Sequence, residues 1–482
     1  MMFLTLGEWL NRRAQLMPEK IGLIDGQTGN RFSYRTLYLR AYALAAYLAQ
    51  YYNIQPGQRI AILALNSPEY LDLLFASALL GAILVPLNWR LTERELLSLL
   101  ADCQPQLLIY DESHRIKATE VADQYSGLAL LATAAFPGAD VGLARRCEPV
   151  QSPDGEEIAL ILYTSGTTGR PKGAMLSHRM LTWNAINTQI SWGLREDDIT
   201  LTFAPFFHAG GLNVLTTPLY HLGGTVVLAP NAEPGTLLEL VERERCTLLF
   251  AVPTVFERIS EHAAFATTDF SALRFCVTGG SPCPREIIER YARSGLQMRQ
   301  GYGLTEVGVN CFSLAPEDAL SRPGSVGKPI FHSYARVIEA GVDVAPGEVG
   351  ELALAGPHLC SGYWQQPEAT REAYQDGWWY TGDLVRADSD GYYSIVGRKK
   401  DMFISGGENI YPAEIERVIQ GHPDVLEVAV IPQPDPQWGE SGLALVVLHS
   451  PGILASTDIL AHCTGQLARY KIPKTVRFVE AL

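Results

Sequence analysis

The sequence lacks the patterns of several common protein classes. Its eight cysteines are scattered and form no C-x-x-C pair, which argues against a thiolate zinc site and a disulfide scaffold and fits a reducing cytoplasm. The formal charge of −14 argues against a nucleic-acid-binding surface, which needs a basic stripe. The longest mainly apolar run, Leu73–Leu87, is broken by Ser77, Gly81 and Pro86 and is shorter than the roughly 20 residues of a membrane span. We therefore expect a cytoplasmic protein with neither nucleic-acid partner nor transmembrane segment.

Other missing patterns exclude further classes of protein. No internal repeat or low-complexity tract is evident, and no G-x-S-x-G elbow marks a serine hydrolase. The N-terminal stretch Met1–Gln15 has the pattern of an amphipathic helix, and its apolar part is too short and interrupted for a signal peptide. A chain of 482 residues is also too long for one ordinary domain.

Strand-like and helix-like segments alternate along most of the chain. Ser67 before Pro68 predicts a helix start, and Thr92 with Glu95 forms the pattern of a capping box. This alternation predicts an α/β fold with parallel-rich sheets covered by helices on both faces. The predicted strands are Arg59–Leu65, Ile83–Leu87, Leu107–Tyr110, Thr225–Leu228, Thr247–Val252 and Leu273–Thr278.

The composition changes near residue 397, where Gly-rich loops and short strands give way to a compact α+β pattern. We place a domain boundary there. The predicted elements after it are helix Pro412–Gln420, strands Leu426–Ile431 and Leu443–Leu448, helix Thr457–Ala468 and strand Val476–Val479.

The most informative segment is YTSGTTGRPKG, Tyr163–Gly173, which follows the apolar run Ile158–Leu162. Glycines let backbone N–H groups turn toward an anion, and the hydroxyls and the lysine add donors. It is not a Walker A motif, because Lys172 comes three residues after Gly169 and is followed by glycine. A flexible surface loop is the weaker interpretation, since so many donors rarely follow a buried strand directly. The predicted phosphate-binding residues are Thr164, Ser165, Gly166, Thr167, Thr168, Gly169 and Lys172.

Further motifs follow at long intervals, and together they carry a family resemblance. They are APFFHAGG (204–211), VTGGSPCP (277–284), QGYGLTE (300–306), WYTGDLV (379–385) and GRKKDMFISGGENIYPAEIE (397–416). In this order they resemble the adenylate-forming superfamily, which includes acyl-CoA synthetases, adenylation domains of nonribosomal peptide synthesis and firefly luciferase. The resemblance spans nearly the whole chain. It implies an N-terminal domain (1–397) with a smaller barrel-like subdomain, a hinge (398–401) and a small mobile α+β C-terminal domain (402–482).

The resemblance implies a two-step reaction with ATP, Mg²⁺ and coenzyme A. A carboxylate attacks the α-phosphate of ATP, and a thiol then displaces AMP from the acyl-adenylate. We expect an AMP-forming acid:CoA ligase for a medium- or long-chain fatty acid or an arylalkenoic acid, because glycines cluster in the motifs that would line the acyl pocket. An adenylation enzyme with another acyl acceptor, a luciferase-like oxygenase and a weakened acyl-adenylate- or CoA-binding protein remain alternatives, and a homodimer is left open.

Several residue types suit such a nucleotide. Tyr302 lies between two glycines, so a base can stack on its ring. Glu306 suits a bridging Mg²⁺, and Asp383 is an acceptor for two ribose hydroxyls. Alone, these residues fit equally a core tyrosine, a solvated glutamate and a turn aspartate. The resemblance gives catalytic roles to Thr164, Lys172, Thr305, Glu306 and Arg398, nucleotide contacts to Gly280, Ser281, Gln300, Gly301, Tyr302, Gly303, Thr305, Asp383 and Arg398, and acyl-pocket positions to His208, Gly211, Gly279, Gly303 and Gly308.

By the same resemblance Lys400 is the hinge, and Gly406, Gly407, Glu408 and Asn409 face coenzyme A. One departure concerns the family's adenylation lysine, which lies in a G-K motif near the C-terminus. Here the sequence ends YKIPKTVRFVEAL. Lys471 and Lys474 belong to the element before that motif, so neither takes over the role, and we expect adenylation to be slower than CoA transfer in this chain.

Overall fold

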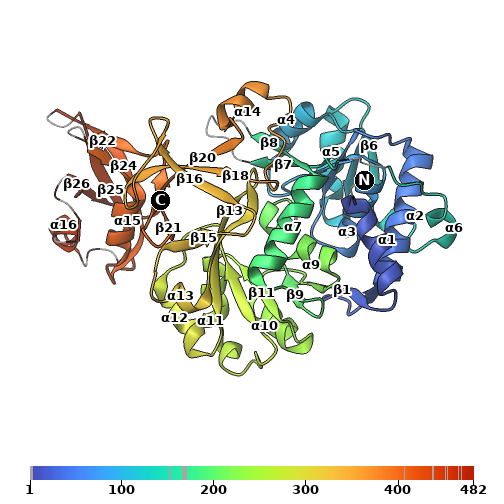
Figure 1. Cartoon of the computed structure of the whole chain (residues 1–482), viewed down its shortest axis with the longest axis horizontal. Helices are drawn as coiled ribbons and strands as arrows, with labels where there is room; N and C mark the ends of the chain where they lie inside the picture. Colours follow the sequence, from blue (N-terminus) through green and yellow to red (C-terminus); the bar gives the residue numbers. More distant parts are fainter. Residues whose placement is uncertain are drawn as a thin grey trace. The chain divides into compact units, whose positions relative to one another are not determined.

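The structure is a computed structural model of the 482-residue chain (Figure 1). It describes residues 4–150, 154–164, 171–405, 408–436, 439–450, 452, 454–464, 466–467, 469 and 471–482. The chain divides into two compact units. The first contains Met1–Ala335 and Leu354–Trp379, and the second contains Arg336–Ala353 and Tyr380–Leu482. The predicted boundary near residue 397, between an N-terminal and a C-terminal domain, stays a prediction.

The first unit contains a mainly parallel sheet with the strand order β6-β5-β3-β4-β7-β8, in which only the last pair is antiparallel among the described pairings. The predicted strands in this sheet are confirmed, with ends that differ by at most two residues. Its strands are β3 (Arg59–Leu63), β4 (Ile83–Pro86), β5 (Leu107–Tyr110), β6 (Ala129–Ala132), β7 (Ile158–Thr164) and β8 (Lys172–Ser177).

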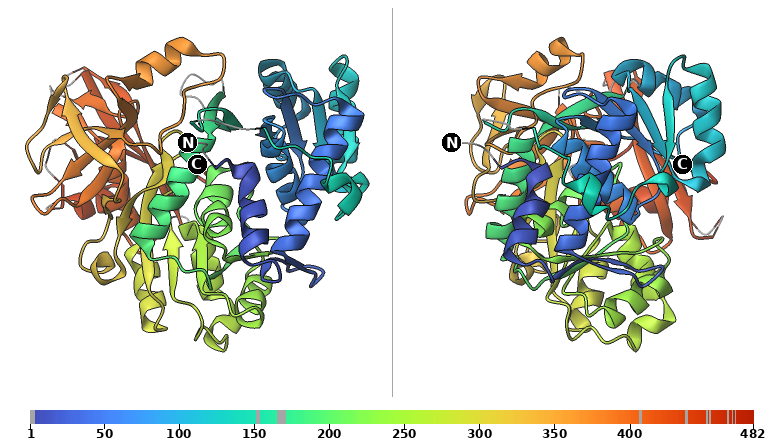
Figure 2. Two further views of the ribbon diagram at one scale, coloured as in Figure 1. Left: turned by 45° about the vertical axis from the view of Figure 1, so that its right-hand side comes forward. Right: turned by 90° about the vertical axis from the view of Figure 1, so that its right-hand side faces the viewer.

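The helix starts that the sequence predicts are present. The Ser67 side chain accepts the Tyr70 N–H at the start of α3. Thr92 and Glu95 form the predicted capping box of α4, with the Thr92 N–H 2.8 Å from a Glu95 carboxylate oxygen. The blue helices α1 and α2 lie side by side in Figures 1 and 2. The helices are α1 (Leu6–Leu16), α2 (Tyr34–Tyr52), α3 (Pro68–Leu79), α4 (Glu93–Cys103), α5 (Arg115–Gln124) and α6 (Val141–Ala144), with 3₁₀ turns η1 (Glu112–His114) and η2 (Thr133–Ala135).

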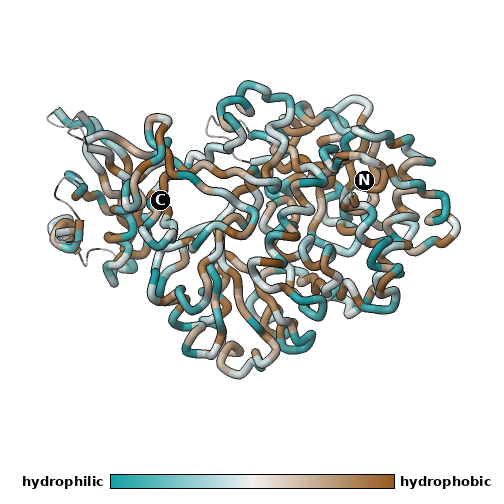
Figure 3. The backbone as a smooth tube through the Cα atoms, in the orientation of Figure 1, coloured by the Kyte–Doolittle hydropathy of each residue, from teal (hydrophilic) through white to brown (hydrophobic). Residues whose placement is uncertain are grey.

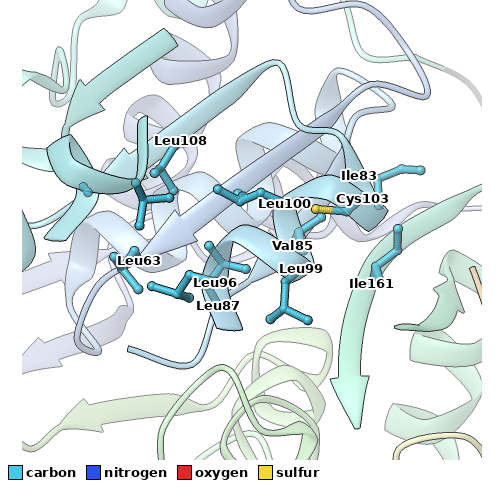
Figure 4. Packing of buried hydrophobic residues seen from close by; sticks show 13 residues of the cluster. Leu63, Ile83, Val85, Leu87, Leu96, Leu99, Leu100, Cys103, Leu108 and Ile161 are labelled. Atoms are coloured by element: carbon cyan, nitrogen blue, oxygen red, sulfur yellow. The ribbon is translucent and has the colours of Figure 1, made fainter. Parts of the chain in front are cut away.

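One face of this sheet packs against α4 and α5 (Figure 4). Alternate strand residues point to this side, as the two-residue period of a strand requires, for example Ile83 and Val85. They meet Leu96, Leu100 and Cys103 of α4, all fully buried. All eight cysteines of the chain are free thiols, in agreement with the sequence analysis.

The first unit also contains a second sheet with the strand order β15-β14-β13-β12-β11-β9-β10-β1-β2. From β13 through β1 the described neighbours are parallel, whereas β14, β15 and β2 are antiparallel to their neighbours. Its strands are β1 (Ile21–Asp25), β2 (Arg31–Ser33), β9 (Ile199–Thr202), β10 (Thr225–Leu228), β11 (Leu248–Ala251), β12 (Phe275–Thr278), β13 (Met298–Leu304), β14 (Gly308–Leu314) and β15 (Ser325–Pro329).

Helices connect these parallel strands, as parallel pairing requires. Figure 3 shows apolar residues along many of the strands and polar residues in many of the loops. The remaining elements of the unit are α7 (His178–Trp192), α8 (Ala209–Asn213), α9 (Thr216–Leu222), α10 (Pro234–Arg243), α11 (Pro253–Glu261), η3 (Ala263–Ala266), α12 (Arg285–Arg293), α13 (Pro316–Ala319), α14 (Pro367–Ala373) and the short β19 (Tyr374–Gln375).

The second unit contains two groups of strands. One has the order β17-β16-β18-β20-β21 and corresponds to the expected smaller subdomain, whose barrel-like closure stays a prediction. The other has the order β23-β22-β25-β24, with β26 parallel to β25. Helices α15 and α16 share a hydrophobic core with this second group. The elements are β16 (Tyr334–Glu339), β17 (Val342–Asp343), β18 (Val349–Ala355), β20 (Trp378–Ala387), β21 (Tyr393–Arg398), β22 (Phe403–Ser405), β23 (Glu408–Ile410), α15 (Pro412–Gln420), β24 (Val425–Asp435), β25 (Gly439–Leu448), α16 (Ser456–Cys463) and β26 (Thr475–Phe478).

Candidate active site

Three of the motifs predicted from the sequence lie at the carboxyl ends of parallel strands in one sheet of the first unit (Figure 1). The segment 203–208 follows β9, residues 279–281 follow β12, and Thr305 and Glu306 follow β13. The strand order β13-β12-β11-β9 places these ends along one edge of the sheet. The carboxyl edge of parallel strands is where α/β proteins bind ligands, so this edge is the candidate active site.

The predicted phosphate loop connects β7 and β8, which pair as an antiparallel hairpin. Thr164 and Lys172 face each other across this pair and close the loop. The structure describes both, whereas five predicted loop residues lie outside the described part of the chain: Ser165, Gly166, Thr167, Thr168 and Gly169. The hairpin therefore fixes the two ends of the loop.

Glu306 is the point where several predicted elements meet. Its Oε1 lies 3.3 Å from the Thr164 hydroxyl and 3.0 Å from the Tyr363 hydroxyl, and both hydroxyls donate to it. Its backbone carbonyl accepts the Cys360 N–H at 2.8 Å. The structure thus brings Thr164 and Glu306 together, as expected for one site, and adds Tyr363, which the sequence analysis missed. The available signal was the pair Gly362-Tyr363, which resembles the glycine-flanked Tyr302.

Lys172 approaches the same tyrosine from the hairpin. Its Nζ lies 4.9 Å from the centroid of the Tyr363 ring, within the distance of a cation–π interaction. The backbone continues the connection, because the Trp364 N–H donates to the Gly173 carbonyl at 2.8 Å. The Lys172 ammonium thus lies over the face of the Tyr363 ring, and the Glu306 carboxylate lies at the hydroxyl of the same side chain.

Tyr302 and its neighbours occupy β13. The Tyr302 ring packs edge-on against Phe312 with a centroid distance of 5.6 Å and is half-buried. Gln300 is buried, and its amide donates to the Ser325 carbonyl at 3.1 Å. Gly280 has φ +85°, a conformation that favours glycine, and Ser281 after it is exposed. The nucleotide contacts of these residues, of Gly301 and of Thr305 stay predictions.

A small pocket lies at the end of β9 and β11. Gly210 and Gly211 of α8 contribute to it, together with the aromatic rings of Phe203 and Phe250. No charged residue lines it, which suits an apolar acyl group. The full lining is Thr200, Leu201, Thr202, Phe203, Ala204, Gly210, Gly211, Leu215, Thr216 and Phe250.

The glycines predicted to widen this pocket have different roles. A Cβ on Gly210 would lie 3.4 Å from the Phe250 ring, an ordinary contact. A Cβ on Gly211 would lie 2.4 Å from two backbone carbonyl oxygens, and one on Gly303 would lie 2.3 Å from the Gly308 oxygen. Close backbone packing requires glycine at Gly211 and Gly303, and the places of both at the acyl group stay predictions. A Cβ on Gly279 would lie 3.3 Å from the Gly301 carbonyl oxygen, which is a tight contact, and Gly308 has φ +83°.

His208 is exposed at the start of α8. Partial desolvation and the charge of Arg90 lower its pKa, so at neutral pH it is an uncharged imidazole. Arg90 lies 4.7 Å from the Trp89 ring and 5.8 Å from the Phe207 ring. A place beside aromatic rings agrees with a position at the substrate, and the lowered pKa makes His208 a weaker base, so a general-base role is not favoured.

The second unit holds the predicted ribose residues. Asp383 and Arg398 are directly opposite each other on β20 and β21, and the Arg398 Nε donates to the Asp383 carboxylate at 2.6 Å. The Asp383 side chain is 5% exposed and that of Arg398 is 44% exposed. Lys399 next to them donates to Glu351 at 2.7 Å. An ionised carboxylate accepts several hydrogen bonds, so Asp383 can bind Arg398 and hydroxyls together.

The predicted hinge and CoA residues follow in the chain. Lys400 is exposed in the turn between β21 and β22, where the Asp401 N–H donates to the Arg398 carbonyl. Gly406 and Gly407 lie outside the described residues, and Glu408 and Asn409 belong to β23. The hinge role of Lys400 and the coenzyme A contacts of the other four residues stay predictions.

Comparisons with known proteins agree with this geometry. A family model described as AMP-binding enzyme matches residues 10–364, and one for the C-terminal domain of AMP-binding enzymes matches residues 414–482. The chain is 41% identical to a feruloyl-CoA synthase of Amycolatopsis over 99% of its own length and 95% of that protein. It is 38% identical to an indoleacetate–CoA ligase of Aromatoleum aromaticum, again covering 99% and 95%.

A solved structure shows the same fold. O-succinylbenzoate coenzyme A synthetase from Bacillus subtilis, in complex with ATP and a magnesium ion, superposes with a TM-score of 0.87 at 30% identity, covering 98% of this chain and 96% of that one. The chain belongs to the AMP-binding enzyme family. The predicted superfamily, its α/β fold and the enzyme class, an AMP-forming acid:CoA ligase, are confirmed. None of the described helices combines the length and hydropathy that a bilayer-crossing segment needs.

Proposed function

We propose that this enzyme activates an aromatic carboxylic acid, such as an arylalkenoate, with ATP and Mg²⁺ and transfers it to coenzyme A. The observation that carries the substrate class is the pair of aromatic rings, Phe203 and Phe250, beside Gly210; the free volume between them is about 10 Å³ here and would have to open to admit an aryl acid. Aromatic walls favour a planar ring by offset or edge-on packing. The names of the feruloyl-CoA and indoleacetate ligases support the same class.

The donor set at Glu306 fits a magnesium ion that is held largely by phosphate. Among the described residues, no group of three or more His, Cys, Asp or Glu side chains could hold a metal. Glu306 supplies a single carboxylate, accompanied by the Thr164 hydroxyl. Mg²⁺ typically binds one or two carboxylates together with substrate phosphates and water. Such an ion would offset the negative charge of the phosphates as the carboxylate approaches.

The chain's own residues would then position the nucleotide and stabilise the charge on its phosphates. Lys172 supplies a positive charge near the reacting phosphate, and Tyr302 stacks on the base. Asp383 accepts the ribose hydroxyls while Arg398, 2.6 Å away, holds its carboxylate in place. No covalent protein intermediate is needed, so alignment and electrostatics carry the rate.

The test is a substrate panel. Purified full-length chain is incubated with ATP, Mg²⁺ and CoA and with ferulate, cinnamate, indoleacetate, octanoate, palmitate or acetate, and AMP and acyl-CoA are quantified by chromatography. We expect the highest kcat/KM with the arylalkenoates and equal amounts of AMP and thioester. Release of AMP without CoA would favour another acyl acceptor, and preference for palmitate would contradict an aromatic substrate. The variant Glu306→Gln serves as the low-activity control.

A further inference from the structure

Tyr363 occupies a position that no assigned role explains. It is 9% exposed, and its hydroxyl donates to Glu306 Oε1 at 3.0 Å. A phenol has an ordinary pKa of about 10 and keeps its proton at physiological pH, so the hydroxyl acts as a donor toward this carboxylate.

The orientation of the Tyr363 ring is fixed by its neighbours in the first unit. The Trp379 ring packs against it with a centroid distance of 5.5 Å at 64°, and the Lys172 ammonium lies over it. Its backbone N–H donates to the Thr370 hydroxyl at 2.9 Å, and Tyr363 forms a β-bridge with Ala174 of β8. The hydroxyl is thus held at one place on the edge of the hairpin that closes the phosphate loop.

The backbone of Glu306 is held by the same segment of chain. The Cys360 N–H donates to the Glu306 carbonyl, and His358 Nδ1 lies 2.5 Å from the Val307 carbonyl. Burial lowers the pKa of His358 to about 4, so its ring is neutral and must carry its proton on Nδ1 to make this bond. Arg179 donates to the Pro357 and Leu359 carbonyls and fixes the segment in turn.

We propose that Tyr363 is a positioning residue for metal-dependent ATP binding: its hydroxyl holds one Glu306 oxygen and so directs the carboxylate toward the cation that accompanies ATP. The inference rests on the proposed function. It follows from the geometry because Glu306 receives donors at Oε1 from both Thr164 and Tyr363, whereas its backbone is fixed separately. Without the phenol the Glu306 side chain would lose the shorter of its two donors and keep only the Thr164 hydroxyl at 3.3 Å, although its backbone would stay in place.

The test compares ATP binding with and without metal. In Tyr363→Phe the ring keeps its packing against Trp379 and Lys172 and loses only the hydroxyl. Calorimetry of ATP binding to the full chain, once in excess Mg²⁺ and once in EDTA, should show affinity about tenfold weaker with Mg²⁺, since a hydrogen bond to a charged group is lost. Affinity in EDTA should be unchanged. Titration with Mg²⁺ at fixed ATP should show that the variant needs a higher Mg²⁺ concentration for half-maximal binding.

Tyr374→Phe is the matched control, because Tyr374 is 44% exposed and its ring also neighbours Trp379. It should leave both affinities unchanged. A double variant with Glu306→Gln should show no further effect of Tyr363→Phe, because the two residues act through one contact. Equal losses in Mg²⁺ and EDTA, or no loss in either, would overturn the positioning role. A parent enzyme whose ATP binding ignores Mg²⁺ would instead contradict the proposed function.

Discussion

The neighbouring glycines Gly210 and Gly211 make a matched test of the acyl pocket. Both lie in α8 and both line the pocket. A methyl group on Gly210 would meet only the Phe250 ring, at 3.4 and 3.5 Å. A methyl group on Gly211 would meet the Ala204 and Pro205 carbonyl oxygens, each at 2.4 Å. The same substitution to alanine should therefore reduce pocket space at one position and strain the backbone at the next.

The magnitudes follow from these contacts. Gly211→Ala cannot relieve its contact by rotation, because a Cβ position is fixed by the backbone, and overpacking costs roughly 1–3 kcal/mol. Replacing a helical glycine by alanine returns about 0.5–1 kcal/mol. The net loss of about 1 kcal/mol should lower the melting temperature by about 1 °C, because the unfolding entropy of a chain of this length is about 1 kcal/mol per kelvin. Gly210→Ala keeps only the helical gain, so its melting temperature should be unchanged or slightly higher.

The assay for Gly210→Ala is substrate preference. The added methyl group takes about one methylene of space beside Phe250, and such a difference in an apolar pocket discriminates about 10–200-fold. We expect kcat/KM for ferulate to fall at least about tenfold relative to that for a small acid such as propionate. If the ratio of the two kcat/KM values stays at the parent value, the acyl group does not bind in this pocket. If Gly211→Ala melts with the parent, the packing explanation for that glycine is wrong.

Three further outcomes are expected. Asp383→Asn should weaken ATP binding about tenfold or more, because hydrogen bonds to a charged group are lost, and should leave melting nearly unchanged because Arg398 remains solvated; unchanged affinity by calorimetry would remove the ribose assignment. Lys400→Pro, which fixes φ near roughly −65°, should slow thioester formation from supplied acyl-adenylate more than adenylation, and equal losses would argue against a hinge. Burial lowers the pKa of His178 to about 4, so the unfolded chain binds a proton below roughly pH 6.5 that the folded chain refuses. Stability should therefore fall between pH 6.5 and 4, and His178→Phe should flatten this part of a melting-temperature profile.

Local signals predicted much of the fold correctly. Ser67 and Thr92 mark the starts of α3 and α4, because a cap depends on residues only three positions apart. The strand Leu107–Tyr110 and the helix Pro412–Gln420 match to the residue. The helix expected over 457–468 ends at Cys463, since Thr464 has an extended ψ of 129°. Its hydroxyl bonds the Leu460 carbonyl instead.

Prolines misled the prediction at the end of another strand. The strand expected to end at Ile431 continues to Asp435 through Pro432 and Pro434. Among the described strands, β24 is at the edge of its sheet, next to β25 alone. A proline lacks a donor but is tolerated at an edge, where one side of the strand needs no partner. Edge position is a property of the assembled sheet and cannot be inferred from a local pattern.

At the candidate active site, too, local patterns could not predict features that depend on the assembled fold. The residue types of the loop Tyr163–Gly173 indicated phosphate binding, whereas the family resemblance was needed to single out Tyr302 and Glu306, because alone they fit other roles as well. Composition did not separate a glycine that opens space, Gly210, from one that lets two backbones meet, Gly303, since the neighbours of Gly303 come from the next strand.

Nor did composition identify Tyr363, which lies 57 positions after Glu306 and whose only local signal is the preceding Gly362. Its importance arises only when β8 carries Lys172 to one side of the ring and the turn after β13 carries Glu306 to its hydroxyl. Residues that act by holding other residues leave little trace in a single sequence, because many side chains can donate one hydrogen bond. Folding selects Tyr363 among them by placing its hydroxyl at the one carboxylate that the proposed reaction needs.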